Sequence, residues 1–103
     1  MGFKQEENNM MTEAEKFSDL VSGLSCVSSF SAYDGRQWVF KSVDGRELSF
    51  ISHEFSMGGT EGLIEGLVVG EWHRAVGYLK ADAAFRAAAY WLTGGDFYQN
   101  ALG

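Results

Sequence analysis

Two Asp-Gly pairs, ten residues apart, constrain the fold of this 103-residue chain more than any other feature. The pairs are Asp34-Gly35 and Asp44-Gly45, and each lies between runs of aromatic and β-branched residues. Asp-Gly favours the positive φ angles of a two-residue hairpin turn, so each pair predicts a turn between antiparallel strands. The three strands that these turns would join cover residues 26–33, 36–43 and 46–53.

The hydrophobic period becomes helical on both sides of this strand region. Thr12 and Glu15 have the spacing of a capping box, and apolar residues follow at helical spacing, so we predict a helix over residues 12–22. A second helix is predicted over residues 81–93, where alanines are followed by a Thr-Gly-Gly stop.

Two more apolar runs lie between the second Asp-Gly pair and the C-terminal helix. Residues 63–69 and 72–79 predict a fourth and a fifth strand. The predicted fold class is therefore α+β, with an N-terminal helix, a four- to five-stranded antiparallel meander and a C-terminal helix. We expect residues 1–11 to form a flexible arm and residues 12–103 to form a single domain.

The predicted turns also assign residues to the two faces of the sheet. Two-residue turns place Phe30 opposite Val39, and Val39 opposite Phe50. One face would hold Phe30, Val39, Val43, Leu48 and Phe50, and the other Val27, Trp38, Phe40 and Ile51. Because both faces would be apolar, either a second layer covers each face or one face binds a partner. The predicted core consists of Phe17, Leu20, Phe30, Val39, Leu48, Phe50, Leu67, Val76, Phe85 and Leu92.

The charge of the chain argues against direct nucleic-acid binding. Fourteen Asp and Glu residues outnumber eight Lys and Arg residues, giving a net charge of −6, and the basic residues occur singly. Nucleic-acid binding requires clustered positive charge. An acidic surface can instead imitate a phosphate backbone and occupy a basic groove of another protein, or it can serve solubility alone. No apolar run approaches a membrane span, and the polar start is unlike a secretory signal, so we expect a cytoplasmic protein without membrane contact.

Signals for catalysis and metal binding are weak. His53 and His73 each lie next to or near a glutamate, but no metal-binding motif accompanies them, and strand-end surface residues are the alternative interpretation. Cys26 follows a predicted helix, where a small buried thiol is common. The glycine-rich residues 58–62 lack the lysine of a phosphate-binding loop. We therefore expect no enzyme, no cofactor and no metal.

The aromatic residues point to protein binding, because large rings anchor protein interfaces. Two short helices cannot easily cover both faces of a five-stranded sheet, so part of the Trp38 face is expected to stay accessible behind an acidic rim. The alternative is that the C-terminal helix or tail covers this face. The predicted partner-binding residues are Trp38, Phe40, Ile51, Tyr33, Glu47 and Glu54.

One segment of the sequence follows a recognisable pattern. A hairpin strand is followed by S-x-G-G-x-x-G-L-x-E and later by G-[YF]-L before a helix, at Ser56, Gly58, Gly59, Gly62, Leu63, Glu65, Gly77, Tyr78 and Leu79. Because of this pattern, the segment of residues 49–79 resembles a motif of small, largely uncharacterised phage and prophage accessory proteins. Lys80 departs from the threonine expected as the following helix cap.

The resemblance implies an origin in a phage or another mobile element. Small acidic proteins of that origin often bind and block a host protein. The first hypothesis is therefore a non-enzymatic inhibitor in the host cytoplasm, binding a host defence protein such as a CRISPR or restriction nuclease complex, which itself binds nucleic acid. The second is a phage or bacterial structural or assembly component, with a homodimer as one form. The third is a small metal-binding enzyme module that uses His53 and His73.

Overall fold

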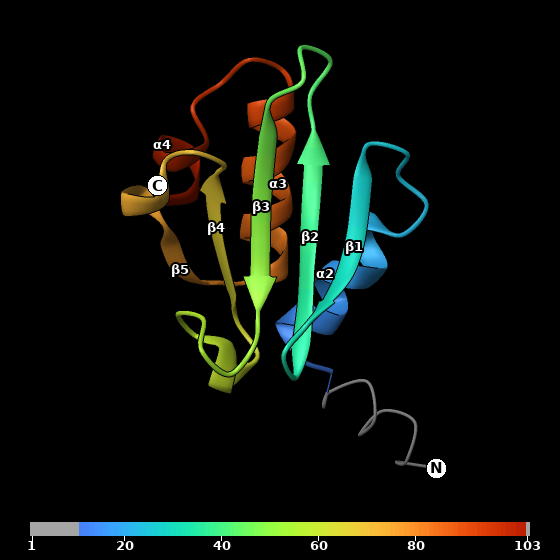
Figure 1. Cartoon of the computed structure of the whole chain (residues 1–103), viewed down its shortest axis with the longest axis vertical. Helices are drawn as coiled ribbons and strands as arrows, with labels where there is room; N and C mark the ends of the chain where they lie inside the picture. Colours follow the sequence, from blue (N-terminus) through green and yellow to red (C-terminus); the bar gives the residue numbers. More distant parts are fainter. Residues whose placement is uncertain (1–10, 103) are drawn as a thin grey trace.

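The five strands of the sheet follow one another in chain order, and each is antiparallel to the next. The computed structural model, which describes residues 11–102, confirms the predicted α+β class and the meander (Figure 1). The arm expected over residues 1–11 lies outside the described residues except for Met11. The strands are β1 (Val27–Ala32), β2 (Gly35–Lys41), β3 (Glu47–Ser52), β4 (Ile64–Val68) and β5 (Val76–Leu79).

The N-terminal helix, α2 (Glu13–Val21), begins at the predicted capping box. Thr12 Oγ1 accepts a hydrogen bond from Glu15 N at 3.1 Å, and Glu15 Oε1 accepts one from Thr12 N at 2.8 Å. These reciprocal bonds satisfy backbone donors that a helix N-terminus otherwise leaves free. The helix buries Phe17 and Val21 against the sheet.

Two helices follow the sheet, α3 (Ala81–Leu92) and α4 (Phe97–Leu102). Alanines fill most of the buried face of α3, and their small side chains let the helix lie close to the strands. Helix α4 starts after Asp96, whose Oδ1 accepts a hydrogen bond from Tyr98 N at 2.8 Å. None of the helices within residues 11–102 combines the length and apolarity needed to cross a membrane.

The apparent fifth strand over residues 72–79 is shorter than predicted. Only its second half forms β5, and Trp72–Arg74 forms the 3-10 helix η2. The glycine-rich connection between β3 and β4 contains a second 3-10 turn, η1 (Gly59–Glu61).

Both hairpin turns differ from their predicted positions. In the first, Ala32 pairs with Gly35, so Tyr33 and Asp34 form the turn and Tyr33 takes the positive φ of 54°. In the second, Ser42 N donates to Arg46 O at 2.9 Å, so three residues, Val43 to Gly45, form the loop. Gly45 takes the left-handed φ of 89° that ends such a three-residue loop.

The three-residue loop shifts the predicted pairing of β2 with β3 by one residue. Trp38 lies opposite Phe50, and Phe40 lies opposite Leu48, so the predicted pairing of Val39 with Phe50 is wrong. A slip of one residue exchanges the two faces of a strand. Trp38 and Phe40 therefore lie on the same face as Leu48 and Phe50, which were predicted to lie on the other face of the sheet. This inner face packs against the helices.

The core is built from aromatic rings on the inner face of the sheet and on the helices. Phe17 of α2 lies 5.0 Å from both Trp38 and Phe50, and Phe97 of α4 lies 5.6 Å from Phe50, between ring centroids. All these rings meet edge to face, a favourable arrangement for aromatic pairs.

The predicted core is right in part. Phe17, Leu48 and Phe50 are buried, and Val76, Phe85 and Leu92 pack partly buried against them. Leu20 and Phe30 are 47% and 50% exposed, so their assignment to the core is wrong. Val39 and Leu67 are partly buried on the opposite, outer face of the sheet.

Candidate functional site

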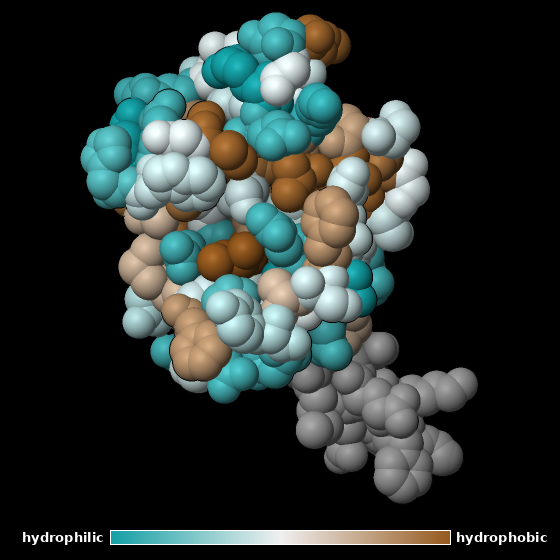
Figure 2. Space-filling model, in the orientation of Figure 1, coloured by the Kyte–Doolittle hydropathy of each residue, from teal (hydrophilic) through white to brown (hydrophobic). Residues whose placement is uncertain are grey.

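The outer face of the sheet carries no helical layer among the described residues. Helices α2, α3 and α4 all pack on the inner face (Figure 1). Figure 2 shows the outer face, on which apolar side chains alternate with polar ones. We call its apolar side chains the outer patch, defined as Phe30, Val39, Ile51, Leu67 and Trp72.

The outer patch is anchored by two exposed aromatic rings. Phe30 on β1 is 50% exposed, and Trp72 on η2 is 66% exposed. Trp72 helps to line a shallow hollow of about 210 Å³ together with Ile51 and Leu67. A hollow beside an exposed tryptophan is a common feature of surfaces that receive a side chain from another protein.

A group of exposed apolar residues continues from the outer patch to the loop end of the sheet. The loop between β3 and β4 brings Phe55 to Tyr33, with ring centroids 5.0 Å apart, and it places Met57 beside Tyr78, whose N donates to Met57 O at 3.2 Å. We call Tyr33, Phe55, Met57 and Tyr78 the loop rim. Glu65 connects it to the outer face, because its Oε1 accepts a hydrogen bond from Met57 N at 2.7 Å.

Two tyrosines of the loop rim have strained backbones. Tyr33, with φ of 54°, and Tyr78, with φ of 59°, are the non-glycine residues with positive φ in the part of the chain that the structure describes. Their side chains are 76% and 61% exposed. The left-handed conformation costs about 1 kcal/mol or more for such a residue, and strain of this kind is concentrated at functional sites.

Carboxylates lie at both ends of the outer face. Glu47 lies at one end of the outer face, and Glu54 and Asp34 lie at the other, where Asp34 Oδ1 accepts a hydrogen bond from Glu54 N at 2.8 Å. The ion pairs described within residues 11–102 involve other carboxylates, those of Glu13, Asp44 and Glu71. The surface therefore has an apolar centre and a border in which these carboxylates outnumber Lys41, which lies opposite Glu47 on β2.

The structure divides the predicted partner-binding residues into two groups. Trp38 and Phe40 are each 1% exposed, so the expectation that they stay accessible is wrong, and the alternative of a covered face is right for them. The cause is the three-residue loop, which turns both rings toward α2. Ile51 and Glu47 lie partly buried on the outer face. Tyr33 and Glu54 are exposed at the loop end of the sheet.

Several surface residues were missed by the sequence analysis: Phe30, Leu67, Trp72, Phe55, Met57 and Tyr78. Two of them, Phe30 and Leu67, had been assigned to the core. The serines around Phe30 indicate a strand with little burial on either face, and β1 is exposed over residues 28–31. That local signal outweighs the apolar character of Phe30 itself.

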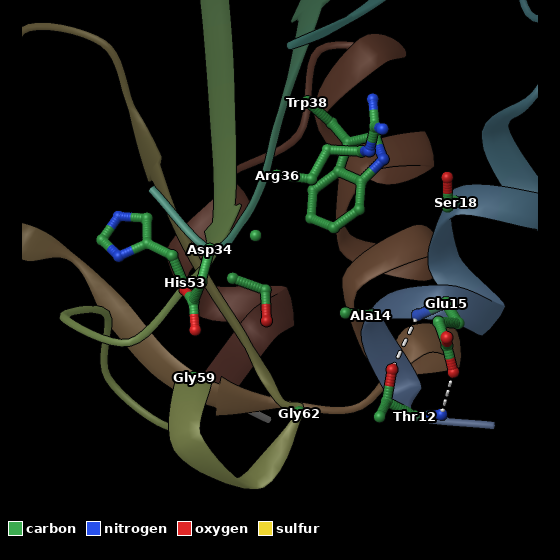
Figure 3. A pocket seen from close by; sticks show the side chains of 12 residues that line it. Thr12, Ala14, Glu15, Ser18, Asp34, Arg36, Trp38, His53, Gly59 and Gly62 are labelled. Carbon is green, nitrogen blue, oxygen red and sulfur yellow. Dashed lines mark hydrogen bonds between the residues drawn. The ribbon is translucent and has the colours of Figure 1, made fainter. Parts of the chain in front are cut away.

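A polar hollow of about 420 Å³ lies on the inner side, between the start of α2 and the ends of β2 and β3 (Figure 3). Glu15, Asp34, Arg36 and His53 line it. Each charged group has a structural bond: Glu15 and Asp34 accept from backbone N–H groups, and Arg36 Nη1 donates to Ser29 Oγ at 2.9 Å. These bonds lie within the start of α2, between the two loops at this end of the sheet, and between β2 and β1.

The imidazole of His53 is also engaged in local structure. Its Nδ1 accepts a hydrogen bond from Phe55 N at 3.1 Å, and its ring lies 4.8 Å from the Tyr33 ring. Within residues 11–102, no hydroxyl or thiol donates to an imidazole, and no three His, Cys, Asp or Glu side chains cluster as metal ligands do. His73 is an exposed residue of η2.

The glycine-rich segment has a packing role. Gly62 has a φ of 74°, and a Cβ at this position would lie 2.8 Å from Thr12 Cβ. The segment therefore packs against the first residue of the α2 capping box, which supports its structural interpretation.

No family model matches the chain, and neither does any curated protein or solved structure.

Proposed function

We propose that this protein is a non-enzymatic binding protein that docks onto another protein through the outer patch and the loop rim. The observation that carries the proposal is a sheet face without a helical layer that ends in exposed tyrosines on strained backbones. An apolar, aromatic centre with an acidic border matches a partner surface that is basic and partly apolar.

The partner we propose is a host protein of the defence class, such as a CRISPR or restriction nuclease complex. Two points support this choice. The net charge of −6 suits a groove whose positive charges otherwise bind nucleic acid. The resemblance of residues 49–79 to phage accessory proteins suggests an inhibitor that acts inside the host cell. An assembly role would use the same surface with a phage or bacterial partner.

The proposal is tested by capturing the partner from a host lysate and measuring its affinity for matched variants. Trp72→Ala removes the more exposed of the two aromatic rings of the outer patch. Leu20→Ala is the control, because Leu20 is 47% exposed on α2, on the other side of the sheet. We expect W72A to weaken binding by about 30-fold, the effect of a hot-spot residue of about 2 kcal/mol, and L20A to leave it unchanged.

Inhibition is tested separately from binding. A captured nuclease should lose activity when the wild-type protein is added. The W72A variant should inhibit the nuclease less, in proportion to its lost affinity. Equal affinities of W72A and L20A would overturn the proposed surface. Binding without any effect on nuclease activity would favour the assembly role.

A further inference from the structure

Strand β1 forms an edge of the sheet that lacks the usual protection. Among residues 11–102, it pairs with β2 on one side only. Its sequence VSSFSA contains no charged residue and no proline, and residues 28–31 are exposed. Natural proteins protect such edges with charges, prolines, bulges or short strands. The opposite edge has this protection, because β5 is four residues long and its pairing with β4 is irregular.

The hairpin geometry identifies the free backbone groups of β1. Ala32 and Gly35 close a two-residue turn, so they form a hydrogen-bonded pair, and such pairs recur at every second residue. Lys41 N donates to Cys26 O at 2.9 Å in the same series. The N–H and C=O groups of Ser28 and Phe30 therefore point to β2, and those of Ser29 and Ser31 point out of the sheet.

We propose that β1 pairs with β1 of a second copy of this chain, antiparallel, about a two-fold axis at Phe30. Ser29 of each copy then lies opposite Ser31 of the other, and the four outward N–H groups all find a carbonyl. The two Phe30 residues face one another as a non-hydrogen-bonded pair on the outer face, with Cα atoms about 4.5 Å apart. Aromatic side chains opposite one another stabilise such pairs.

The edge of β1 is a place where two copies of this acidic chain can meet without opposing carboxylates. Two chains of net charge −6 repel one another over most of their surfaces. The edge of β1 carries no carboxylate, and its register is self-complementary, as a two-fold interface requires. The contact is small, so we expect a dissociation constant in the micromolar range or weaker, typical of contacts below about 1,200 Å². Dimerisation would join the two sheets and make the two outer patches continuous.

Ser31 offers a matched pair of variants for the test. Ser31→Pro removes one outward N–H and places the proline ring where a second strand would pair. Ser31→Ala keeps that N–H and removes only the hydroxyl. Sedimentation velocity from about 10 µM to about 1 mM, a range that brackets micromolar affinities, should show dimers for the wild type and for S31A. S31P should dimerise at least tenfold more weakly, while its circular dichroism stays native.

Hydrogen exchange of the wild-type protein gives a second measurement that needs no variant. The amides of Ser29 and Ser31 should become protected as the protein concentration rises, while Ser28 and Phe30 stay protected throughout. A wild type that is monomeric at the highest concentration overturns the proposal, as does a folded S31P that dimerises like S31A. Protection of Ser29 and Ser31 only in the presence of a captured protein would mean that the edge receives a foreign strand instead. Trp72 is unchanged in these variants, so a failure to dimerise would leave the Trp72 test of the proposed function standing.

Discussion

The carboxylate of Glu13 caps a helix that begins 68 residues later. Its Oε1 accepts a hydrogen bond from Ala81 N, the first residue of α3, at 2.9 Å. Lys80, the N-cap residue of α3, makes no side-chain capping bond, so Glu13 takes the place of the threonine expected there. The same side chain pairs with Lys16 Nζ at 3.0 Å. One carboxylate thus joins the starting turns of two helices that are far apart in the sequence.

Replacing Glu13 with glutamine should destabilise the fold. The amide oxygen can still accept from Ala81, but the negative charge at the N-terminus of α3 is lost, together with the pairing to Lys16. We expect a loss of about 1 kcal/mol of unfolding free energy, the scale of a charged helix cap, measured by urea denaturation. Glu61→Gln is the control, because Glu61 is exposed. An equal effect of both variants would contradict the capping role.

The stability should also depend on pH through Glu13. The hydrogen bond from Ala81 and the bond to Lys16 lower the pKa of this carboxyl below its ordinary value of 4.5. Because the folded state binds the proton less tightly than the unfolded state, this stabilisation is complete above pH 4.5 and is lost as the pH falls through the lowered pKa. The difference in unfolding free energy between wild type and E13Q should therefore shrink below that pH. A difference that stays constant down to acid unfolding would exclude Glu13 as its source.

Gly66 should not tolerate alanine. A Cβ at this position of β4 would lie 2.8 Å from the ring of Phe50 and 2.9 Å from that of Phe97. Forcing the two rings apart should cost about 1–3 kcal/mol, as overpacking of a core does, and lower the melting temperature. Phe97→Leu provides the check, because it makes room for the new methyl group. G66A should therefore lower the unfolding free energy less in the F97L background than in the wild type. An equal loss in both backgrounds would show that the ring of Phe97 moves aside without cost.

Replacing Tyr33 with asparagine should separate stability from binding. Asparagine adopts the left-handed conformation more easily than tyrosine, so the strain at φ of 54° is reduced. We expect thermal unfolding to occur at the same or a higher temperature, although the ring contacts with His53 and Phe55 are lost. Affinity for the captured partner should fall by at least several-fold. A variant that binds normally would place Tyr33 outside the contact surface.

Local signals were sufficient to predict most elements of this fold. The capping box of Thr12 and Glu15 marks the start of α2, and the glycines after Thr93 mark the end of α3. The two Asp-Gly pairs locate the hairpins because turn chemistry is a property of a few adjacent residues. The bond between Glu13 and Ala81 had no such signal, since it depends on how two distant helices pack.

The strand register could not be decided locally. Asp44-Gly45 is compatible with a two-residue loop, and equally with a three-residue loop in which glycine takes the last position. The choice decides whether Trp38 shares a face with Ile51 or with Phe50. It depends on the helices: Phe17 packs against Trp38, Phe40 and Phe50 together, and only the three-residue loop presents all three rings to it. The misplacement of Trp38 and Phe40 in the candidate site followed from this single pairing.

The burial pattern of the tryptophans gives the protein an intrinsic optical reporter. Of its three tryptophans, Trp38 and Trp91 are 1% and 2% exposed, whereas Trp72 is 66% exposed on the outer patch. A water-soluble cationic quencher such as caesium therefore reaches the indole of Trp72 and leaves the other two emitting. A molecule that binds the outer patch shields that indole from the quencher. Binding can therefore be followed as recovered fluorescence in the unlabelled protein.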